Sequence, residues 1–168
     1  MPGKREDILD VAEQMIRKHG YNGFSFRDIA AAVDVKSASV HYHFPTKADL
    51  AAAVAKRYRE NFEMALAESS TSDGNPLADW RTLFRRALEA DGLMCLCGIL
   101  AVEGDDLPPQ VAEEARLFMQ DGIDAIANVD GFTREDGLRV LAQLEGAMLL
   151  ARSLGDPQVF DQATKHLV

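Results

Sequence analysis

Apolar residues recur three and four positions apart along almost the whole chain, and no stretch alternates apolar and polar residues for long. That spacing is typical of amphipathic helices, whereas alternation would indicate strands. Within residues 4–19 it places Ile8, Ala12 and Ile16 on one face, and Gly20 follows as a C-terminal cap. The pattern therefore predicts an all-α protein of about nine helices.

Helix boundaries follow from capping residues and breakers. Ser25 and Asp28 have capping-box spacing, Thr46 is a suitable N-cap, and Pro45 favours the end of a helix just before it. The polar run from Ser69 to Pro76 is the clearest linker. The expected helices span about residues 4–19, 25–33, 37–43, 47–69, 76–91, 93–103, 108–128, 134–154 and 157–167.

The charge is unevenly distributed along the chain. The net charge is −9, but residues 1–60 carry 10 Lys and Arg against 8 Asp and Glu, while residues 61–168 carry 8 against 19. A mildly basic first third joined to an acidic remainder is expected when only one end meets a polyanion. The overall acidity is therefore no objection to binding of nucleic acid by the N-terminal end.

The chain has no run close to the roughly 20 apolar residues that cross a bilayer, and its first residues are charged and amphipathic. Its two cysteines, Cys95 and Cys97, are too few for a disulfide framework. We therefore expect a cytoplasmic protein with no membrane partner.

The helices expected at residues 25–33 and 37–43 have the spacing of a helix-turn-helix motif. Val40 and Phe44 can anchor the second helix on a core, which leaves its hydroxyl, imidazole and phenol groups facing outward. An ordinary helical hairpin with surface polar residues has the same spacing, so both interpretations stay open from spacing alone. A metal site is disfavoured because His41 and His43 point to nearly opposite sides of a helix.

The segment GFSFRDIAAAVDVKSASVHYHFPTKADL resembles the N-terminal signature of the TetR (tetracycline repressor) family of bacterial transcriptional regulators. The family pattern has a Thr/Ser-x-Arg-x-Ile-Ala helix, a Gly-Val-Ser turn, a Leu-Tyr-x-His-Phe recognition helix and a Ser-Lys-x-x-Leu helix start, in that order. The likeness covers about the first 60 residues without a gap. It implies a homodimer with a DNA-binding domain at residues 1–47 and an effector-binding and dimerisation domain at residues 48–168.

The resemblance also implies which residues contact DNA. Residues 36–39 fall on base-facing positions, whereas Ser25, Arg27, residues 41–43 and Lys47 fall on phosphate-facing ones. The expected DNA contacts are Ser25, Arg27, Lys36, Ser37, Ala38, Ser39, His41, Tyr42, His43 and Lys47.

Three residues depart from the family pattern. Asp34 stands where Gly is usual in the turn, and Asp tolerates the left-handed conformation better than most residues. Lys36 replaces Ser and removes a capping hydroxyl, while His41 replaces Tyr and adds a titratable group. These positions are the first candidates for an altered operator preference.

The stretch MCLCGILAVEGDDLPPQV is similar to a Gly-Cys-Leu-x-Gly-x-Leu-x-x-Glu pattern in a subgroup of the family, some members of which sense electrophiles or oxidants through the cysteine. Here that cysteine is Cys95. A place near the start of the helix expected at residues 93–103 would favour a reactive thiolate. The absence of a Lys, Arg or His within several residues favours a buried core thiol instead, and both roles stay open.

Large apolar residues in the acidic remainder suit a helical core and, in part, an adaptable effector pocket. The candidate pocket residues are Phe62, Leu66, Trp80, Phe84, Leu88, Met94, Cys97, Phe118, Met119, Ile123 and Met148. The last two helices can form a four-helix bundle with a second copy, or can pack only within one chain. The candidate interface residues are Leu141, Leu144, Glu145, Met148, Leu149, Arg152 and Phe160.

Taken together, these features predict a ligand-responsive regulator, with a repressor favoured, that binds a palindromic operator as a homodimer. A small-molecule effector would tilt the helix at residues 47–69 and change the spacing of the two recognition helices. The alternatives are a repressor that senses electrophiles through Cys95 and, less favoured, a helical protein-interaction module. No catalytic set, metal site or cofactor is expected, so an enzyme is disfavoured.

Overall fold

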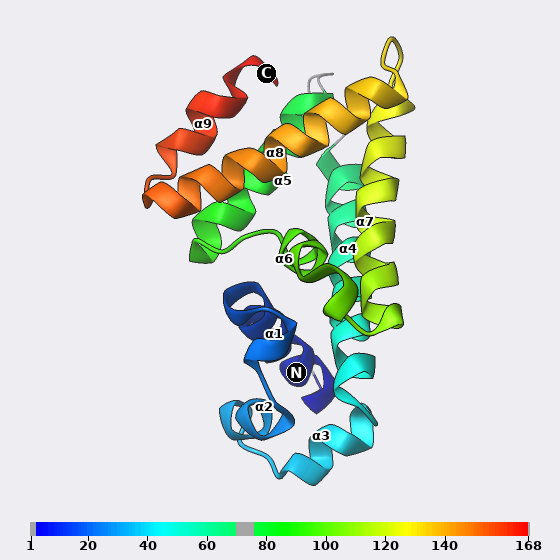
Figure 1. Cartoon of the computed structure of the whole chain (residues 1–168), viewed down its shortest axis with the longest axis vertical. Helices are drawn as coiled ribbons and strands as arrows, with labels where there is room; N and C mark the ends of the chain where they lie inside the picture. The colour runs from blue at the N-terminus through cyan, green and yellow to red at the C-terminus, as the bar shows by residue number, and fades with distance from the viewer. Residues whose placement is uncertain (1–2, 70–75, 168) are drawn as a thin grey trace. The chain divides into compact units, whose positions relative to one another are not determined.

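The computed structural model describes residues 3–69 and 76–167. Within these ranges it has nine α-helices, three short 3-10 helices and no strand (Figure 1). The helices are α1 (Lys4–His19), α2 (Phe26–Ala32), α3 (Ser37–His43), α4 (Lys47–Ser69), α5 (Pro76–Asp91), α6 (Leu96–Glu103), α7 (Pro109–Ala127), α8 (Arg134–Leu154) and α9 (Gln158–Thr164), with η1 (Tyr21–Gly23), η2 (Gly104–Asp106) and η3 (Lys165–Leu167). The prediction of an all-α fold is confirmed.

Reciprocal capping fixes the starts of α2, α4 and α8. The Ser25 hydroxyl accepts a hydrogen bond from the Asp28 N–H at 3.3 Å, and the Asp28 carboxylate accepts one from the Ser25 N–H at 2.9 Å. Thr46 and Asp49 repeat the exchange at α4, and a third box starts α8. Such boxes satisfy N–H groups that a helix start leaves open, which is why these starts could be predicted from sequence.

The predicted start of the sixth helix was three residues too early, because α6 begins at Leu96. The preceding helix ends through Gly92, which has φ of +67° and donates its N–H to the Leu88 carbonyl at 2.9 Å. Residues 93–95 follow this turn and are not helical. Cys95 therefore precedes the helix instead of lying in its first turn.

The chain divides into two compact units. The first consists of the residues up to Arg59 together with Leu96–Arg116, and the second consists of Glu60–Cys95 together with the residues from Leu117 onward. The first unit thus contains α1, α2, α3 and α6 entire, whereas α4 and α7 each contribute to both units.

The core of the first unit is apolar and fully buried. Its inward residues include Ile8, Ile16, Ile29, Val40 and Leu50, each 0% exposed. Arg57 of α4 also ties this helix to α1, because its guanidinium lies 2.8–3.3 Å from the carboxylates of Glu6, Asp10 and Glu13. These three acidic residues fall on one face of α1, so a single guanidinium of α4 contacts three carboxylates along that face.

The second unit is built around α8, whose inward residues Leu144 and Met148 are fully buried, as is Phe160 of α9. The α7 and α8 backbones approach closely, because a Cβ atom at Gly137 would lie 2.5 Å from the Ile123 carbonyl oxygen. Arg85 of α5 donates from Nε to the Asp161 carboxylate of α9 at 3.0 and 3.1 Å. Across the described helices, none is long and apolar enough to span a membrane.

Candidate DNA-binding surface

The turn between α2 and α3 is held by backbone hydrogen bonds. The N–H of Val35 donates to the Ala30 carbonyl at 2.9 Å, and Asp34 takes φ of +54°, in the left-handed region. A short polar side chain makes this conformation accessible to a residue other than glycine. Asp34 therefore supports the turn where the family pattern has Gly.

Two apolar residues fasten α3 to the first unit. Val40 is 0% exposed and Phe44 is 3% exposed, and the Arg5 guanidinium lies 5.2 Å from the Phe44 ring centroid. Both residues point inward, as the sequence pattern predicts, so the opposite side of α3 is presented outward.

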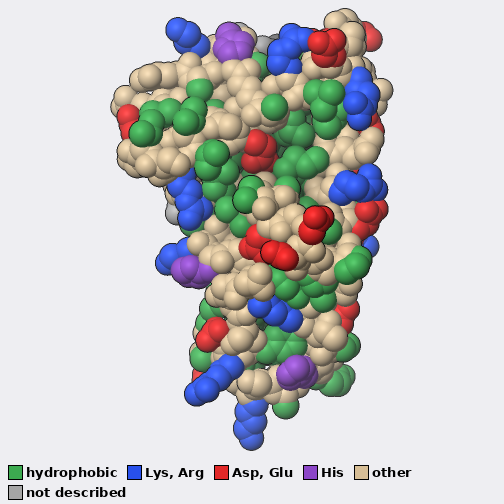
Figure 2. All heavy atoms as spheres, in the orientation of Figure 1, with side chains coloured by type: hydrophobic (Ala, Val, Ile, Leu, Met, Phe, Trp, Pro, Cys, Tyr) green, Lys and Arg blue, Asp and Glu red, His purple; other side chains and the backbone are tan. Residues whose placement is uncertain are grey.

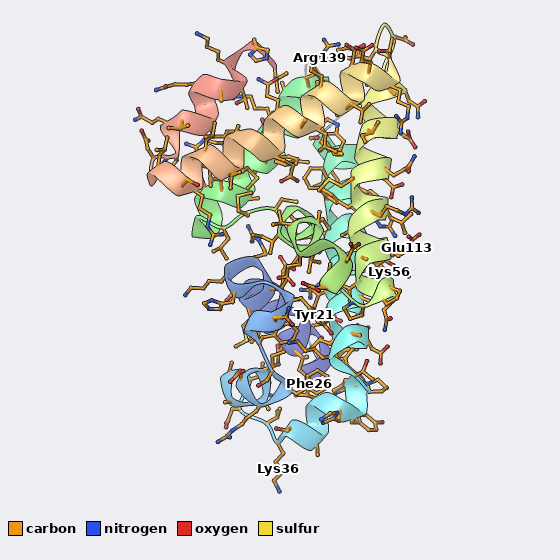
Figure 3. The ribbon with its side chains drawn as sticks, in the orientation of Figure 1. Tyr21, Phe26, Lys36, Lys56, Glu113 and Arg139 are labelled. Atoms are coloured by element: carbon orange, nitrogen blue, oxygen red, sulfur yellow. The ribbon has the colours of Figure 1, made fainter. Side chains whose placement is uncertain are left out.

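The residues expected to contact DNA lie on α2, the turn, α3 and the first residue of α4. Tyr42 is 85% exposed, and Lys36 projects away from the neighbouring helices (Figure 3). Basic and histidine side chains gather at the end of this unit that carries α2 and α3 (Figure 2). Of the ten residues, six are exposed and four are half-buried; the exposed ones are Ser25, Arg27, Lys36, Ala38, His41 and Tyr42, and the half-buried ones are Ser37, Ser39, His43 and Lys47.

The departures at positions 36 and 41 have distinct consequences. Lys36 occupies the N-cap position of α3, but its side chain makes no capping hydrogen bond. Its backbone carbonyl accepts a hydrogen bond of 2.8 Å from the Ser39 N–H. The His41 ring packs edge-on against Phe26 at 4.6 Å, and its Nδ1 lies 3.3 Å from the Pro45 carbonyl oxygen. His41 therefore links α3 to α2, while Lys36 leaves its charge at the surface.

Lys47 is held differently from a surface lysine. Its ammonium lies 4.7 Å from the ring centroid of Tyr21 and 4.5 Å from that of Phe24. Burial lowers the pKa of Lys47, while the carboxylates of Glu103 and Asp28 oppose this effect. The lysine thus belongs to a partly buried cluster with Tyr21 and Phe24.

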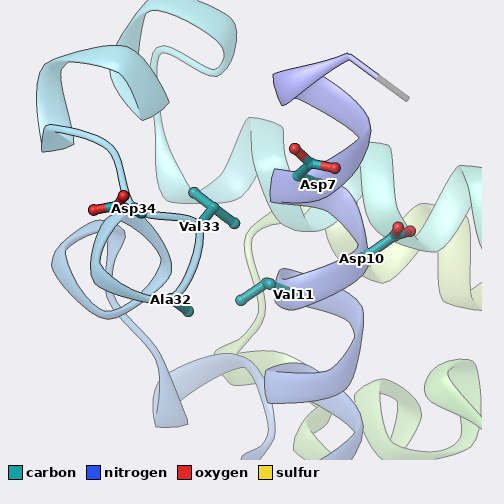
Figure 4. A pocket seen from close by; sticks show the side chains of 6 residues that line it. All are labelled: Asp7, Asp10, Val11, Ala32, Val33 and Asp34. Atoms are coloured by element: carbon teal, nitrogen blue, oxygen red, sulfur yellow. The ribbon is translucent and has the colours of Figure 1, made fainter. Parts of the chain in front are cut away.

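A shallow cavity of about 380 Å³ lies in the first unit between α1 and the turn after α2. Figure 4 shows the Asp7, Asp10 and Asp34 carboxylates at this cavity, with Val11 and Val33 between them. Because carboxylates repel phosphates, this side of the unit does not suit the DNA backbone. None of the predicted effector-pocket residues lines it.

The structure brings four of the predicted pocket residues together in the second unit. The Phe62 ring centroid lies 5.1 Å from that of Trp80, 5.6 Å from Phe84 and 5.4 Å from Phe118. Leu88, Met94 and Met148 are buried in the same unit, and Leu66, Met119 and Ile123 are half-buried there. Cys97 is also buried but belongs to the first unit.

Cys95 is 1% exposed and lies beside a carboxyl group that sequence reasoning had assigned to the dimer interface. Burial raises the pKa of Glu145 to about 7, an effect that the Cys95 thiol only partly offsets. Both Glu145 carboxyl oxygens are buried without a conventional hydrogen-bond partner in the described ranges. Because the Cys95 thiol is almost fully buried, it lacks the solvent access that a reactive cysteine usually has.

The residues predicted for the dimer interface fall into two groups. Leu141, Leu144, Met148 and Phe160 are buried within a single chain, whereas Leu149 is 56% exposed, and Glu145 and Arg152 are half-buried. The outer side of α8 also exposes Leu138 at 45%, Leu150 at 51% and Leu154 at 67%.

Sequence reasoning assigned no role to Glu103, although it lies in the quoted cysteine motif. The Glu103 carboxylate accepts a hydrogen bond from the Tyr21 N–H at 2.7 Å, across 82 positions of sequence. Glycine at position 20 is a signal in the sequence, because a tight backbone approach often needs a residue without Cβ, and the Glu at the end of the cysteine motif is another. Among the described residues, no cluster of His, Cys, Asp and Glu could hold a metal ion.

Comparison with known proteins agrees with this geometry. Residues 8–54 match the family described as bacterial regulatory proteins, tetR family. A crystal structure of a TetR-family transcriptional regulator from Agrobacterium tumefaciens is 30% identical, with a TM-score of 0.90 over 98% of this chain and 95% of that one. A TetR transcriptional regulator from Legionella pneumophila is 32% identical, with a TM-score of 0.89 over 99% and 96%.

A curated relative, the HTH-type transcriptional repressor DhaR of Mycobacterium sp. (strain GP1), is 28% identical over 120 residues. That match covers 69% of this chain and only 60% of the relative. The two solved relatives, by contrast, match along nearly their whole length, and their identity extends beyond the helix-turn-helix. The chain therefore belongs to the TetR family of bacterial transcriptional regulators.

Proposed function

We propose that this regulator is a repressor that binds a palindromic operator as a homodimer and releases it when a small-molecule effector binds. The observation that carries the proposal is the way in which α3 packs on the core of the first unit. Val40 and Phe44 fix one side of the helix in the core, so the side with Lys36, Ala38 and Tyr42 is free to enter a major groove. The relative DhaR is itself named a transcriptional repressor.

The proposed DNA contacts follow from the family resemblance together with the chemistry of the side chains. Lys36 and the small residues after it face base edges, because small side chains let the helix start approach closely. Ser25, Arg27, His41, Tyr42 and His43 face phosphates and set the register on the duplex. Lys47 supports the same surface through its place at the start of α4.

The dimer is proposed to form through the outer side of α8, together with α9. The exposed leucines at 138, 149, 150 and 154 supply apolar area on α8, and hydrophobic side chains are visible over this part of the surface in Figure 2. The buried Leu144 and Met148 hold the helix that presents them. A two-fold pair is required because half-sites of a palindrome lie roughly 34–36 Å apart.

The effector is proposed to bind among the aromatic residues around Phe62. Residues 1–47 would then form the DNA-binding domain and residues 48–168 the effector-binding and dimerisation domain. α4 is the connecting element, because its residues from Lys47 to Arg59 belong to the first unit and the following ones to the second. An effector shifts the equilibrium only if it prefers the state in which the recognition helices are misplaced.

A thiol-based sensor is a weaker proposal. The sequence motif favours it, but the thiol of Cys95 is almost fully buried beside the Glu145 carboxyl group. We therefore propose a core role for Cys95. If Cys95→Ser abolished the release of DNA by an electrophile such as N-ethylmaleimide, the sensor role would replace it.

The test is selection of bound sequences from random DNA, followed by affinity measurements at several salt concentrations. We expect a palindromic consensus and an affinity that falls steeply with salt. The double variant Arg27→Ala, Lys36→Ala should bind at least about tenfold more weakly. The matched control Arg116→Ala, Arg139→Ala removes the same charge from exposed side chains elsewhere. Failure to select any sequence, or equal losses in both double variants, would count against the proposal.

A further inference from the structure

We propose that Glu103 is a positioning residue for DNA binding: from the end of α6 it fixes η1 and, through the Lys47 cluster, the starts of α2 and α4. The proposal rests on the proposed function, because it treats operator affinity as the readout. All residues involved belong to the first unit.

The first contact is direct. Glu103 Oε1 accepts a hydrogen bond of 2.7 Å from the Tyr21 N–H, the first N–H of η1. Gly20, just before it, has φ of +75° and lies so close to Glu103 that a Cβ atom there would overlap Oε1. Glycine at this position therefore serves two needs at once: the left-handed turn at the end of α1 and the approach of the carboxylate.

The second contact is electrostatic. The ammonium of Lys47 lies between the Tyr21 and Phe24 rings, at 4.7 and 4.5 Å, and these rings meet edge-on at 6.3 Å. Burial lowers the pKa of Lys47, and among the opposing charges Glu103 has the larger effect. The Tyr21 pKa is raised by burial and then by the same carboxylate. Glu103 therefore stabilises the charge of the cation that both rings surround.

The residues of this cluster adjoin the elements that are proposed to contact DNA. Phe24 immediately precedes Ser25, the N-cap of α2 and one of the expected phosphate contacts. Lys47 is the first residue of α4 and follows the Thr46 cap. One carboxylate thus sets the positions of two helix starts that flank the recognition helix.

The carboxylate is only half satisfied, which makes the contact easy to release. Glu103 Oε2 is buried and has no hydrogen-bond partner among the described residues. An unpaired buried oxygen costs free energy, so the contact between Glu103 and Tyr21 stabilises the fold less than a fully hydrogen-bonded carboxylate would. A shift of α6 by about 1 Å would lengthen the bond to Tyr21 beyond hydrogen-bonding distance.

α6 is well placed along the chain to carry such a shift. Its first residue, Leu96, directly follows Cys95 of the second unit, and Glu103 is its last residue. Cys95 therefore lies directly before the eight-residue helix that Glu103 ends. This connection is separate from the one through α4.

The experiment uses the full chain and an operator selected with the unaltered protein. Glu103→Ala should weaken operator binding about tenfold, because a bond to a charged acceptor is lost. Glu103→Gln keeps an acceptor for the Tyr21 N–H and should retain most of the affinity. Glu113→Ala, an exposed residue in the same segment, controls for the removal of one negative charge.

A second pair of variants displaces the carboxylate without changing it. Gly20→Ala should weaken operator binding by a similar factor, because the new Cβ atom occupies the site of Oε1. Gly131→Ala is the matched control, since Gly131 has φ of +84° and open space around its Cβ position. Equal effects of the two alanines would overturn the proposal, because backbone strain alone would then explain the loss.

Amide hydrogen exchange separates this proposal from the proposed function. In the Glu103→Ala variant the Tyr21 N–H should exchange at least about tenfold faster, while amides in α8 stay protected. This readout needs no DNA, so it stands even if no operator is found. Unchanged exchange at Tyr21 together with operator affinity within twofold of the unaltered protein would refute the role of Glu103.

Discussion

The carboxyl group of Glu145 in α8 lies beside the thiol of Cys95, and both groups are buried in the second unit. Burial raises the pKa of the Glu145 carboxyl group, and the hydrogen bond from the Cys95 thiol opposes this rise only in part. The Glu145 carboxyl group is therefore expected to stay largely protonated below neutral pH, in a protein whose second part is otherwise strongly acidic.

This pair makes stability depend on pH. Burial raises the pKa of Glu145 from 4.5 to about 7, so between these values the folded chain binds a proton that the unfolded chain has lost. Stability therefore falls as the pH rises from about 4.5 to about 7, by roughly 2–3 kcal/mol. Urea unfolding at fixed protein concentration should show that Glu145→Gln removes most of this fall. An unchanged slope in the variant, with Glu135→Gln as the control on the same helix, would contradict the assignment.

Arg27 and Lys36, two of the residues proposed to contact DNA, should differ in what they control. Arg27→Ala should weaken binding to all sequences alike and reduce the salt slope by about one, as expected for a lost phosphate contact. Lys36→Ala should relax sequence preference near its base contact with a smaller change in slope. Fluorescence anisotropy over a salt series, with a second selection from random DNA, measures both. Identical effects of the two variants would mean that Lys36 does not face the bases.

The exposed leucines of α8 should govern assembly. A double variant, Leu149→Glu with Leu154→Glu, places charges on the most exposed apolar positions of this helix and should yield monomers. Sedimentation velocity at several concentrations reports the change, and operator affinity should fall at least about tenfold with it. The control Val102→Glu alters another strongly exposed apolar residue, on α6. If the double variant stayed dimeric, the dimer interface would have to lie outside this side of α8.

The crossing of α7 and α8 should be intolerant of any side chain at Gly137. Gly137→Ala drives a Cβ atom into the Ile123 carbonyl, and since that group is backbone the cost should be about 2–4 kcal/mol. Gly146→Ala in the same helix meets nothing within 4 Å and should be neutral or slightly stabilising. Thermal unfolding distinguishes the two variants, and similar melting temperatures would contradict the close approach.

Local signals explain what the sequence could predict. The Ser25–Asp28 and Thr133–Asp136 boxes mark helix starts through side chains three residues apart, so the bounds of α2 and α8 follow from nearby residues alone. The predicted start of α6 is wrong because Gly92 and the residues after it carry no capping pair, and an apolar run suggests a helix even where the chain is not helical.

Contacts between distant residues explain what the sequence could not predict. Arg57 meets Glu13 across 44 positions, and Glu103 meets Tyr21 across 82. Periodicity assigns each residue a face of its own helix but not a partner on another helix. The helical periodicity of α1 therefore gives no sign that its acidic residues pair with Arg57 of α4.

The course of the chain through the two units limits where the chain can be divided into independent parts. The peptide leaves the first unit after Arg59, returns at Leu96 and leaves again after Arg116. A fragment cut after the DNA-reading helices would lack α6, and with it the carboxylate at Tyr21 and part of the apolar cover of α1. Exchange of DNA-binding domains between TetR-family regulators should therefore succeed only when the α6 segment is transferred together with the domain.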